Sequence, residues 1–417
     1  MRGKIKTMSN PEKDKIQDRA LLSSRSRNHL VLEWSTGCGK TLASIKIIED
    51  IIKNNPLAVG TIICKESTHR KNWLTDIAKH GYNKVLDNTS ILLYASAKKL
   101  VDVDFIILDE CHALTPMKTT LIKSMIKPHT KVIYLSATIE KQKMYLIDVM
   151  SDHSAAYYRI PLTKAIELNL LPTPSVKIHR TELSNDDNRS YVYVMNKGLK
   201  SKAEKAECDY HNRWNVFNNY KNVRLNVSCN EAEYYQLITE QMDYYKNLSY
   251  SGVEGMRIAC RNKFLNLGSK RKKFLAITKT SKAKQLVQKF RKSEHKFICF
   301  TGSIEQTKLL TNSSAVHSKN TKEHNQELVD CFNRDECNEL FAVKMLREGV
   351  NLTNVQKGII VQLDSTIGSF YQMLGRCLRH EFPEMHLIII EGTQDEVYFT
   401  KAMKDFDKRY IIDEQDK

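Results

Sequence analysis

The sequence contains few residues of the kinds that mark non-globular chains. Its 417 residues include only 15 glycines and 8 prolines, and 41% are hydrophobic, which excludes a fibrous or wholly disordered chain. No run approaches the roughly 18 apolar residues that a membrane-spanning helix needs, and the N-terminal residues contain no apolar signal region. We therefore expect a soluble, cytoplasmic protein with no membrane contact. The length suits two domains or one large one.

Metal-binding patterns are missing as well. The ten cysteines are scattered without a CxxC pair, and none of the 13 histidines lies at zinc-finger spacing from a cysteine. We therefore predict reduced, mostly structural thiols and no zinc site.

Positive charge is in excess, because the chain has 65 Lys and Arg but only 48 Asp and Glu, which gives a net charge of +17. A basic protein of this size most often binds a polyanion, usually nucleic acid.

Short β-branched runs alternate with helical segments at both ends of the chain. Strand-like runs include His29–Trp34, Gly60–Cys64 and Phe297–Phe300, and Thr41–Lys53 has apolar residues at helical spacing. This alternation predicts an α/β fold with two parallel-sheet domains. The tyrosine-rich middle of the chain predicts a mainly helical insertion. We therefore expect an N-terminal domain at 1–165, a linker and the first part of the second domain at 166–182, the insertion at 183–268, and the C-terminal domain at 269–417.

A glycine-containing loop follows the first expected strand and opens the first expected helix. In such a loop, glycines let backbone N–H groups point at phosphate oxygens, and the helix N-terminus adds favourable partial charge. Lys40 is expected to reach the β- and γ-phosphates of ATP, and the Thr41 hydroxyl to bind Mg²⁺. Trp34 stands where a small residue usually begins such a loop, so its indole must point away from the phosphates or narrow the site. The loop residues are Ser35, Thr36, Gly37, Cys38, Gly39, Lys40 and Thr41.

Two carboxylates lie at the carboxyl end of the strand-like run 105–108. Ligands bind at that end of the strands in open α/β sheets. Asp109 is expected to hold Mg²⁺, and Glu110 to orient or deprotonate an attacking water. No second cluster of carboxylates with a catalytic lysine occurs outside these motifs, which disfavours a nuclease.

With these motifs in place, the chain resembles the superfamily 2 helicases and translocases of the DExH group. The resemblance implies two RecA-like domains with the ATP cleft between them. It also implies that Gln17 reads adenine and that Ser136 and Thr138, in the SAT motif, couple hydrolysis to nucleic-acid binding. In the second domain, residues 347–352 are similar to the family's fifth motif, which includes Gly349, and residues 372–379 match its QxxGRxxR motif, which begins at Gln372.

Arg376 and Arg379 lie three residues apart on an expected helix, so both guanidinium groups can face one phosphate. Arginines placed in this way neutralise charge in the transition state of phosphoryl transfer. Because they belong to the second domain and the phosphate loop to the first, ATP is expected to close the cleft between the domains and hydrolysis to release it.

Several segments are candidates for nucleic-acid contact. Lys65, Ser67, Thr68 and Trp73 look like the family's motif Ia, which grips the sugar-phosphate backbone, and Thr301 and Ser303 resemble motif IV. Residues 270–296 hold eleven Lys and Arg with a single acid, and the expected contacts there are Lys270, Arg271, Lys272 and Lys273. Nine tyrosines between residues 191 and 250 could stack on bases or pack the insertion, and packing is favoured. A partner protein could also dock on the insertion.

The pair Asn72-Trp73 and the compact first domain are most similar to phage recombination helicases of the UvsW type. This resemblance implies a DNA-stimulated ATPase that moves on duplex, branched or single-stranded DNA and remodels forks or junctions. His112 stands where RNA helicases have Asp and points the same way. Two alternatives stay open: an RNA helicase or viral transcript-release factor, and a non-hydrolysing nucleic-acid clamp.

Overall fold

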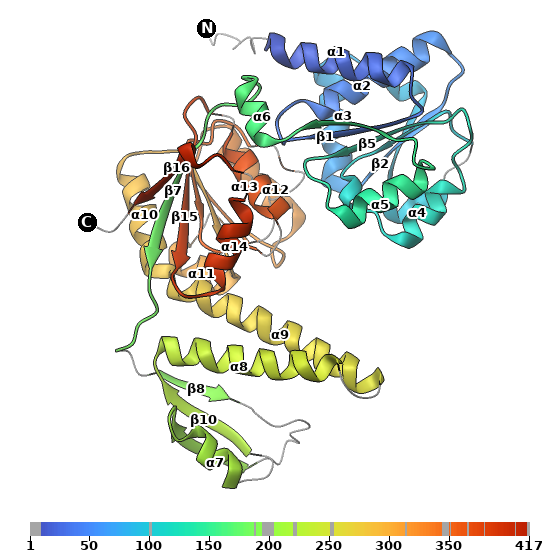
Figure 1. Cartoon of the computed structure of the whole chain (residues 1–417). Helices are drawn as coiled ribbons and strands as arrows, with labels where there is room; N and C mark the ends of the chain where they lie inside the picture. Colours follow the sequence, from blue (N-terminus) through green and yellow to red (C-terminus); the bar gives the residue numbers. More distant parts are fainter. Residues whose placement is uncertain are drawn as a thin grey trace.

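The computed structural model shows two α/β domains and a third unit inserted into the second of them (Figure 1). No helix in the described part of the chain is long and apolar enough to cross a membrane. Two expected site residues, Gly349 and Arg379, lie outside the described residues. The structure describes residues 10–99, 102–186, 189–193, 204–219, 223–250, 254–312, 315–343, 350, 352–364, 367–378, 380–404 and 406–414.

The first domain is built on a six-stranded parallel sheet in the order β3-β2-β4-β5-β1-β6. Its strands are β1 His29–Trp34, β2 Gly60–Cys64, β3 Thr89–Leu93, β4 Phe105–Leu108, β5 Lys131–Ser136 and β6 Ala156–Ile160. Its helices are α1 Pro11–Arg25, α2 Lys40–Asn54, α3 Ser67–Lys79, α4 Pro116–Lys123, α5 Lys141–Met150 and α6 Leu162–Glu167, with short 3₁₀ turns at Asn83–Asp87, Tyr94–Lys99 and Cys111–Ala113. The alternation of strands and helices read from the sequence is confirmed here.

Helices cover both faces of this sheet because successive strand residues point to opposite sides. Leu30 and Leu32 pack in the hydrophobic cluster that includes residues of α1, α2 and α3. Val31, between them, packs in a second cluster with residues of α4 and α5. A strand that is buried on both faces consists almost entirely of apolar residues, which is why these runs are recognisable in the sequence.

The second domain contains a seven-stranded parallel sheet in the order β12-β13-β11-β14-β15-β7-β16. Its strands are β7 Ser175–Thr181, β11 Phe297–Thr301, β12 Ala315–Val316, β13 Glu339–Val343, β14 Lys357–Ile360, β15 Glu384–Ile390 and β16 Ile411–Glu414. Its helices are α10 Thr280–Lys292, α11 Ile304–Leu310, α12 Lys322–Asn333, α13 Ile367–Cys377 and α14 Gln394–Ala402, with a 3₁₀ turn at Lys408–Tyr410. Strand β7 precedes the inserted unit in sequence yet lies between β15 and β16, so this domain is discontinuous along the chain.

The inserted unit is mainly helical, as expected, and it also contains a small sheet that the sequence did not indicate. Helices α8 Glu231–Tyr250 and α9 Glu254–Thr278 lie side by side, and α9 leads into the second domain (Figure 1). The preceding part is not helical throughout, because it forms a three-stranded sheet of β8 Arg189–Tyr193, β10 Val223–Cys229 and β9 Glu204–Asp209, with the short helix α7 Arg213–Asn219. Alternate residues of β10 are buried, which is the period of a half-covered strand. The expected boundary at residue 268 falls inside α9.

The tyrosines of the inserted unit contribute to its core. Tyr191 on β8 stacks on Tyr234 on α8 with ring centroids 3.6 Å apart, and Phe274 on α9 meets Tyr234 edge-on at 4.8 Å. Tyr193 and Tyr245 are buried in the same cluster. For these residues, packing accounts for the aromatic content without any bound base.

A buried ion pair ties the second domain to the end of α9. Lys279 Nζ lies 2.7 Å from Asp395 Oδ2, and both side chains are at most 1% exposed. The amide of Gln362 donates to the other oxygen of Asp395 at 2.8 Å, so the buried carboxylate is well satisfied. Charges withdrawn from water in this way are tolerated only when they are paired and hydrogen-bonded.

A chain of buried side chains crosses the β7–β15 pair. His179 Nε2 lies 2.8 Å from His386 Nδ1, and His386 Nε2 lies 2.6 Å from Glu384 Oε1. Lys177 and Lys357 approach Glu384 from β7 and β14, at 3.2 and 3.1 Å. Burial lowers the pKa of His386 despite the opposing hydrogen bond and charge of Glu384, and the two lysines lower it further.

We expect the stability of the second domain to fall as the pH drops below about 6.5. The unfolded chain then binds a proton that the folded His386 does not, at a cost of at most about 1.4 kcal/mol per pH unit for one histidine. Thermal unfolding between pH 5 and 8, compared with that of His386→Gln, measures this contribution. A variant that keeps the full pH slope of the wild type would contradict the prediction.

Candidate active site

The loop of residues 35–41, called the phosphate-type loop below, joins β1 to α2, and its backbone has a conformation that depends on its glycines. Gly37 and Gly39 have φ angles of +91° and +89°, which favour glycine, and Gly39 stands immediately before α2. Lys40 is the first residue of α2, and its ammonium donates to the carbonyl of Trp34 at 2.7 Å across the loop. The lysine, the Thr41 hydroxyl and the helix N-terminus are therefore collected at the carboxyl end of β1.

Trp34 does not narrow this loop. Its side chain is fully buried and meets Tyr158 on β6 edge-on, with ring centroids 5.2 Å apart. The indole therefore fills the core beneath the sheet edge, and the loop keeps its small residues. Of the two orientations that the sequence left open, the structure shows the one that points away.

Helix α1 lies against the loop and brings two polar side chains to it. Gln17 is buried, and a Cβ placed on Gly39 would lie 2.6 Å from its Nε2. Its Oε1 has no hydrogen-bond partner in the described part of the chain, so a donor is required there. Lys13 donates to the Gly37 carbonyl at 2.9 Å. No sequence pattern pointed to Lys13, because isolated lysines on amphipathic helices are usually solvated.

Asp109 and Glu110 follow β4 at the same edge of the sheet. Asp109 Oδ2 accepts a hydrogen bond from the indole N–H of Trp73 at 2.9 Å, and Asp109 Oδ1 accepts one from the Glu110 backbone at 3.0 Å. Burial, with the neighbouring Glu110 charge, raises the pKa of Asp109 to about 6, although the Trp73 hydrogen bond and the electrostatic effects of His69 and Lys40 oppose the shift. This electronegative, oxygen-rich environment fits a divalent cation.

Glu110 is linked to the SAT motif through one histidine. Its backbone is in the left-handed region at φ +51°, and its Oε2 lies 3.2 Å from His112 Nδ1. The same ring nitrogen lies 3.3 Å from Ser136 Oγ, which donates to the Thr138 carbonyl at 2.8 Å. His112 therefore bridges the carboxylate expected to handle water and the motif expected to couple hydrolysis to binding.

Helix α13 of the second domain lies against the first domain at two points. A Cβ on Gly375 would lie 2.8 Å from Thr36 Cβ in the phosphate-type loop, and one on Gly368 would lie 3.1 Å from Thr138 Oγ1. Gln372 stands on α13 between these two glycines. A side chain at position 375 would force a shift, and one at position 368 would need Thr138 to move slightly, so α13 lies close to both the loop and the SAT motif.

Arg376 is held within its own domain. It is 7% exposed, and its guanidinium donates to the carbonyl of Val350. Val350 belongs to the segment that resembles the family's fifth motif, so the side chain links two expected motifs. This contact uses one of the five N–H donors of the guanidinium.

The expected nucleic-acid contacts divide into open and engaged residues. Lys65, Ser67 and Thr68 lie where β2 ends and α3 begins, and Ser67 is exposed. Trp73 is only 1% exposed, which corrects the expectation that it grips a sugar-phosphate backbone.

Thr301 and Ser303 are also buried, and both are engaged inside the second domain. Thr301 shares a hydrogen bond with Thr307 at 2.5 Å, and the Ser303 hydroxyl caps α11 by accepting from Gln306 N at 3.1 Å. In this structure both side chains therefore have a structural role, and their contact with phosphates stays a prediction.

The four basic residues of the cluster on α9 differ in whether their side chains are exposed or engaged within the protein. Lys273 is exposed, and so is Lys270, although its ammonium lies 5.6 Å from the Tyr234 ring centroid. Arg271 donates to Thr239 and Gln394 at 3.2 and 2.8 Å, and Lys272 forms an ion pair with Asp364. Arg271 and Lys272 therefore tie α9 to the inserted unit and the second domain.

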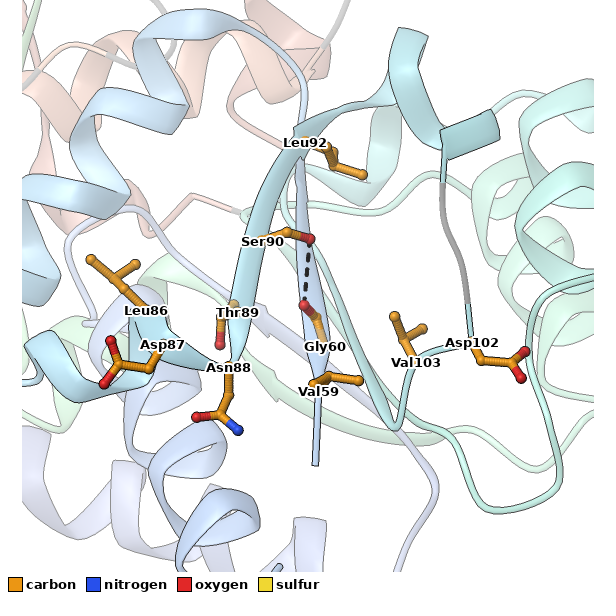
Figure 2. Close-up of a pocket in the computed structure, with 10 residues that line it drawn as sticks. All are labelled: Val59, Gly60, Leu86, Asp87, Asn88, Thr89, Ser90, Leu92, Asp102 and Val103. Atoms are coloured by element: carbon orange, nitrogen blue, oxygen red, sulfur yellow. Dashed lines mark hydrogen bonds between the residues drawn. The ribbon is translucent and has the colours of Figure 1, made fainter. Parts of the chain in front are cut away.

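A hollow of about 430 Å³ lies elsewhere on the first domain, around the start of β2 and β3 (Figure 2). Asn88, at its rim, donates its amide to the carbonyls of Pro56 and Ala58, at 3.1 and 2.9 Å. The hollow is at the amino ends of the strands, whereas ligands of open parallel sheets bind at the carboxyl ends. The residues gathered around Lys40 and Asp109 are therefore the better candidate site.

Together these features define a class of fold: two parallel-sheet α/β domains of the RecA-like kind found in helicase cores, with a phosphate-type loop in one facing a helix of the other. Residues 262–381 match the family model of the helicase conserved C-terminal domain. The solved structure of an S. cerevisiae Dbp5 point variant bound to RNA and ADP BeF3 is similar, with a TM-score of 0.57, 10% identity and coverage of 98% of this chain and 95% of that chain. The Pyrococcus furiosus Hef helicase domain has a TM-score of 0.47 and 15% identity, covering 94% of this chain and 97% of that one. No curated protein gives a significant match.

Proposed function

We propose that the chain is an ATP-dependent nucleic-acid translocase of the superfamily 2 DExH type, which moves on DNA and remodels forks or junctions as the UvsW-type helicases do. The observation that carries the proposal is the approach of Gly375 in the second domain to Thr36 in the phosphate-type loop of the first. A nucleotide held by that loop would contact both domains. Its hydrolysis would change how they meet, and a repeated change of this kind can drive movement along a strand.

The residues fit a magnesium nucleotide. The turn at Gly37 and Gly39 would direct backbone N–H groups at the phosphates. The buried Gln17 oxygen has no hydrogen-bond partner among the described residues and could accept from the adenine amino group. Lys40 and the start of α2 would hold the phosphates, and Thr41 and Asp109 would hold Mg²⁺. When bound, Mg²⁺ would neutralise charge on the phosphates.

Glu110 would orient the attacking water and take up its proton. The resulting change at the carboxylate would reach Ser136 through His112, because His112 Nδ1 lies within 3.3 Å of both groups. Thr138 and Gly368 then extend this path to α13. These contacts would connect hydrolysis to the position of the second domain, and Arg376 on α13 would stabilise the transferred phosphate.

The test is ATP hydrolysis by the purified chain, titrated separately with single-stranded DNA, duplex DNA, a four-way junction and single-stranded RNA. We expect stimulation by duplex or junction DNA. Glu110→Gln should lower the stimulated rate by about 10²–10⁴-fold, because it removes the base without changing the size of the side chain. Stimulation by RNA alone would favour an RNA helicase or transcript-release factor, and equal inactivity of wild type and variant would favour a non-hydrolysing clamp.

A further inference from the structure

Trp73 has a polar contact that its burial would not require. It lies on α3 and is 1% exposed, and its Nε1 donates to Asp109 Oδ2 at 2.9 Å. Trp34, the other fully buried tryptophan of the first domain, has no hydrogen-bond partner for its Nε1 in the described part of the chain. The indole of Trp73 therefore does more than fill volume.

The geometry fixes the Asp109 carboxylate from two sides. Oδ2 is held by the indole, and Oδ1 is held by the backbone N–H of Glu110 at 3.0 Å. Each carboxylate oxygen has two lone pairs, so one remains on each oxygen for a further partner. A tryptophan N–H can only donate a hydrogen bond, and it carries no charge. It can therefore orient the carboxylate without competing with a cation for it.

We propose that Trp73 is a positioning residue that orients Asp109 toward the divalent cation of the bound nucleotide, an inference that rests on the proposed function. Partners of this kind around a metal ligand typically change metal affinity by about 10–100-fold when they are removed. Loss of the indole N–H should therefore weaken cation binding. Binding of the nucleotide itself should change less, because the loop and Lys40 are untouched.

The experiment measures Mn²⁺, as a spectroscopic substitute for Mg²⁺, by electron paramagnetic resonance in the presence of a non-hydrolysable ATP analogue. In Trp73→Phe, the Mn²⁺ dissociation constant should rise about tenfold or more. Trp214→Phe is the control, because Trp214 is 45% exposed on α7 of the inserted unit and should leave the constant unchanged. Trp34→Phe is a second control, because its thermal unfolding measures the loss of stability when a fully buried indole is replaced by a smaller ring.

Two further variants keep the inference testable if Trp73→Phe fails to fold. Benzothienylalanine at position 73 keeps the shape of tryptophan and lacks the N–H, so it should show the same weakening. In an Asp109→Asn background, Trp73→Phe should cause little additional loss. Wild-type Mn²⁺ affinity in the Trp73 variants would overturn the role of Trp73 alone, whereas absence of Mn²⁺-nucleotide binding by the wild type would overturn the proposed function with it.

Discussion

Replacing Lys40 by alanine is expected to lower ATP turnover by about 10²–10³-fold or more. The ammonium lies at the start of α2, where it would meet charge that develops on the transferred phosphate, and loss of one preorganised donor of that kind has an effect of this size. Steady-state hydrolysis at saturating nucleic acid measures the loss. Fluorescent-nucleotide binding separates weaker binding from slower chemistry.

A matched control for Lys40 lies on the same helix. Lys46 faces α1 and lies 3.7 and 3.5 Å from Asp14 and Asp18, whose side chains are largely exposed. Lys46→Ala should therefore leave turnover within about twofold and change stability by less than about 1 kcal/mol. Comparable losses in the two variants would show that Lys40 acts on folding and not on the nucleotide.

Asp395→Ala is expected to destabilise the second domain by about 3–5 kcal/mol. The substitution leaves the ammonium of Lys279 buried without its countercharge and leaves the Gln362 amide without its acceptor. Amide hydrogen exchange of β15 and α14 measures the loss, because it reports on this domain alone. Protection factors equal to those of the wild type would contradict the prediction.

Two other variants show whether the cost is specific to the unpaired charge. Asp407→Ala removes the carboxylate from an ion pair with Arg409, whose side chain is 78% exposed, and from the backbone N–H of Arg409, and it should destabilise the domain much less than Asp395→Ala does. The double variant Lys279→Met with Asp395→Leu removes both buried charges. It should be more stable than Asp395→Ala, because apolar residues of similar volume often replace a buried pair at little cost.

Much of the fold is readable from the sequence because buried parallel strands have a distinctive composition. Runs such as Gly60–Cys64 are apolar at nearly every position, and the structure places a strand at those same residues. The three-stranded sheet of the insertion was not predicted, because β10 alternates Val223, Leu225 and Val227 with polar residues within a tyrosine-rich region. Half-covered strands carry a weaker pattern than fully buried ones.

The candidate site was less fully predictable, because motifs report residue types and not their partners. The loop around Lys40 and the pair at Asp109 could be placed from flanking strands and helices. The bond from Trp73 to Asp109 joins residues 36 positions apart, and the contact of Gly375 with Thr36 joins two domains. Such contacts depend on how α3 and α13 pack, which local patterns do not specify.

The place of β7 between β15 and β16 has a consequence for biosynthesis. Ser175 pairs with Glu384, so about two hundred residues leave the ribosome before β7 can find its neighbour. Once residue 229 has emerged, the described strands of the first domain and of the inserted unit are all present, whereas both edges of β7 still lack their partners β15 and β16. Nascent chains stalled before residue 384 should therefore protect the first domain from protease and leave the segment around β7 open to cleavage.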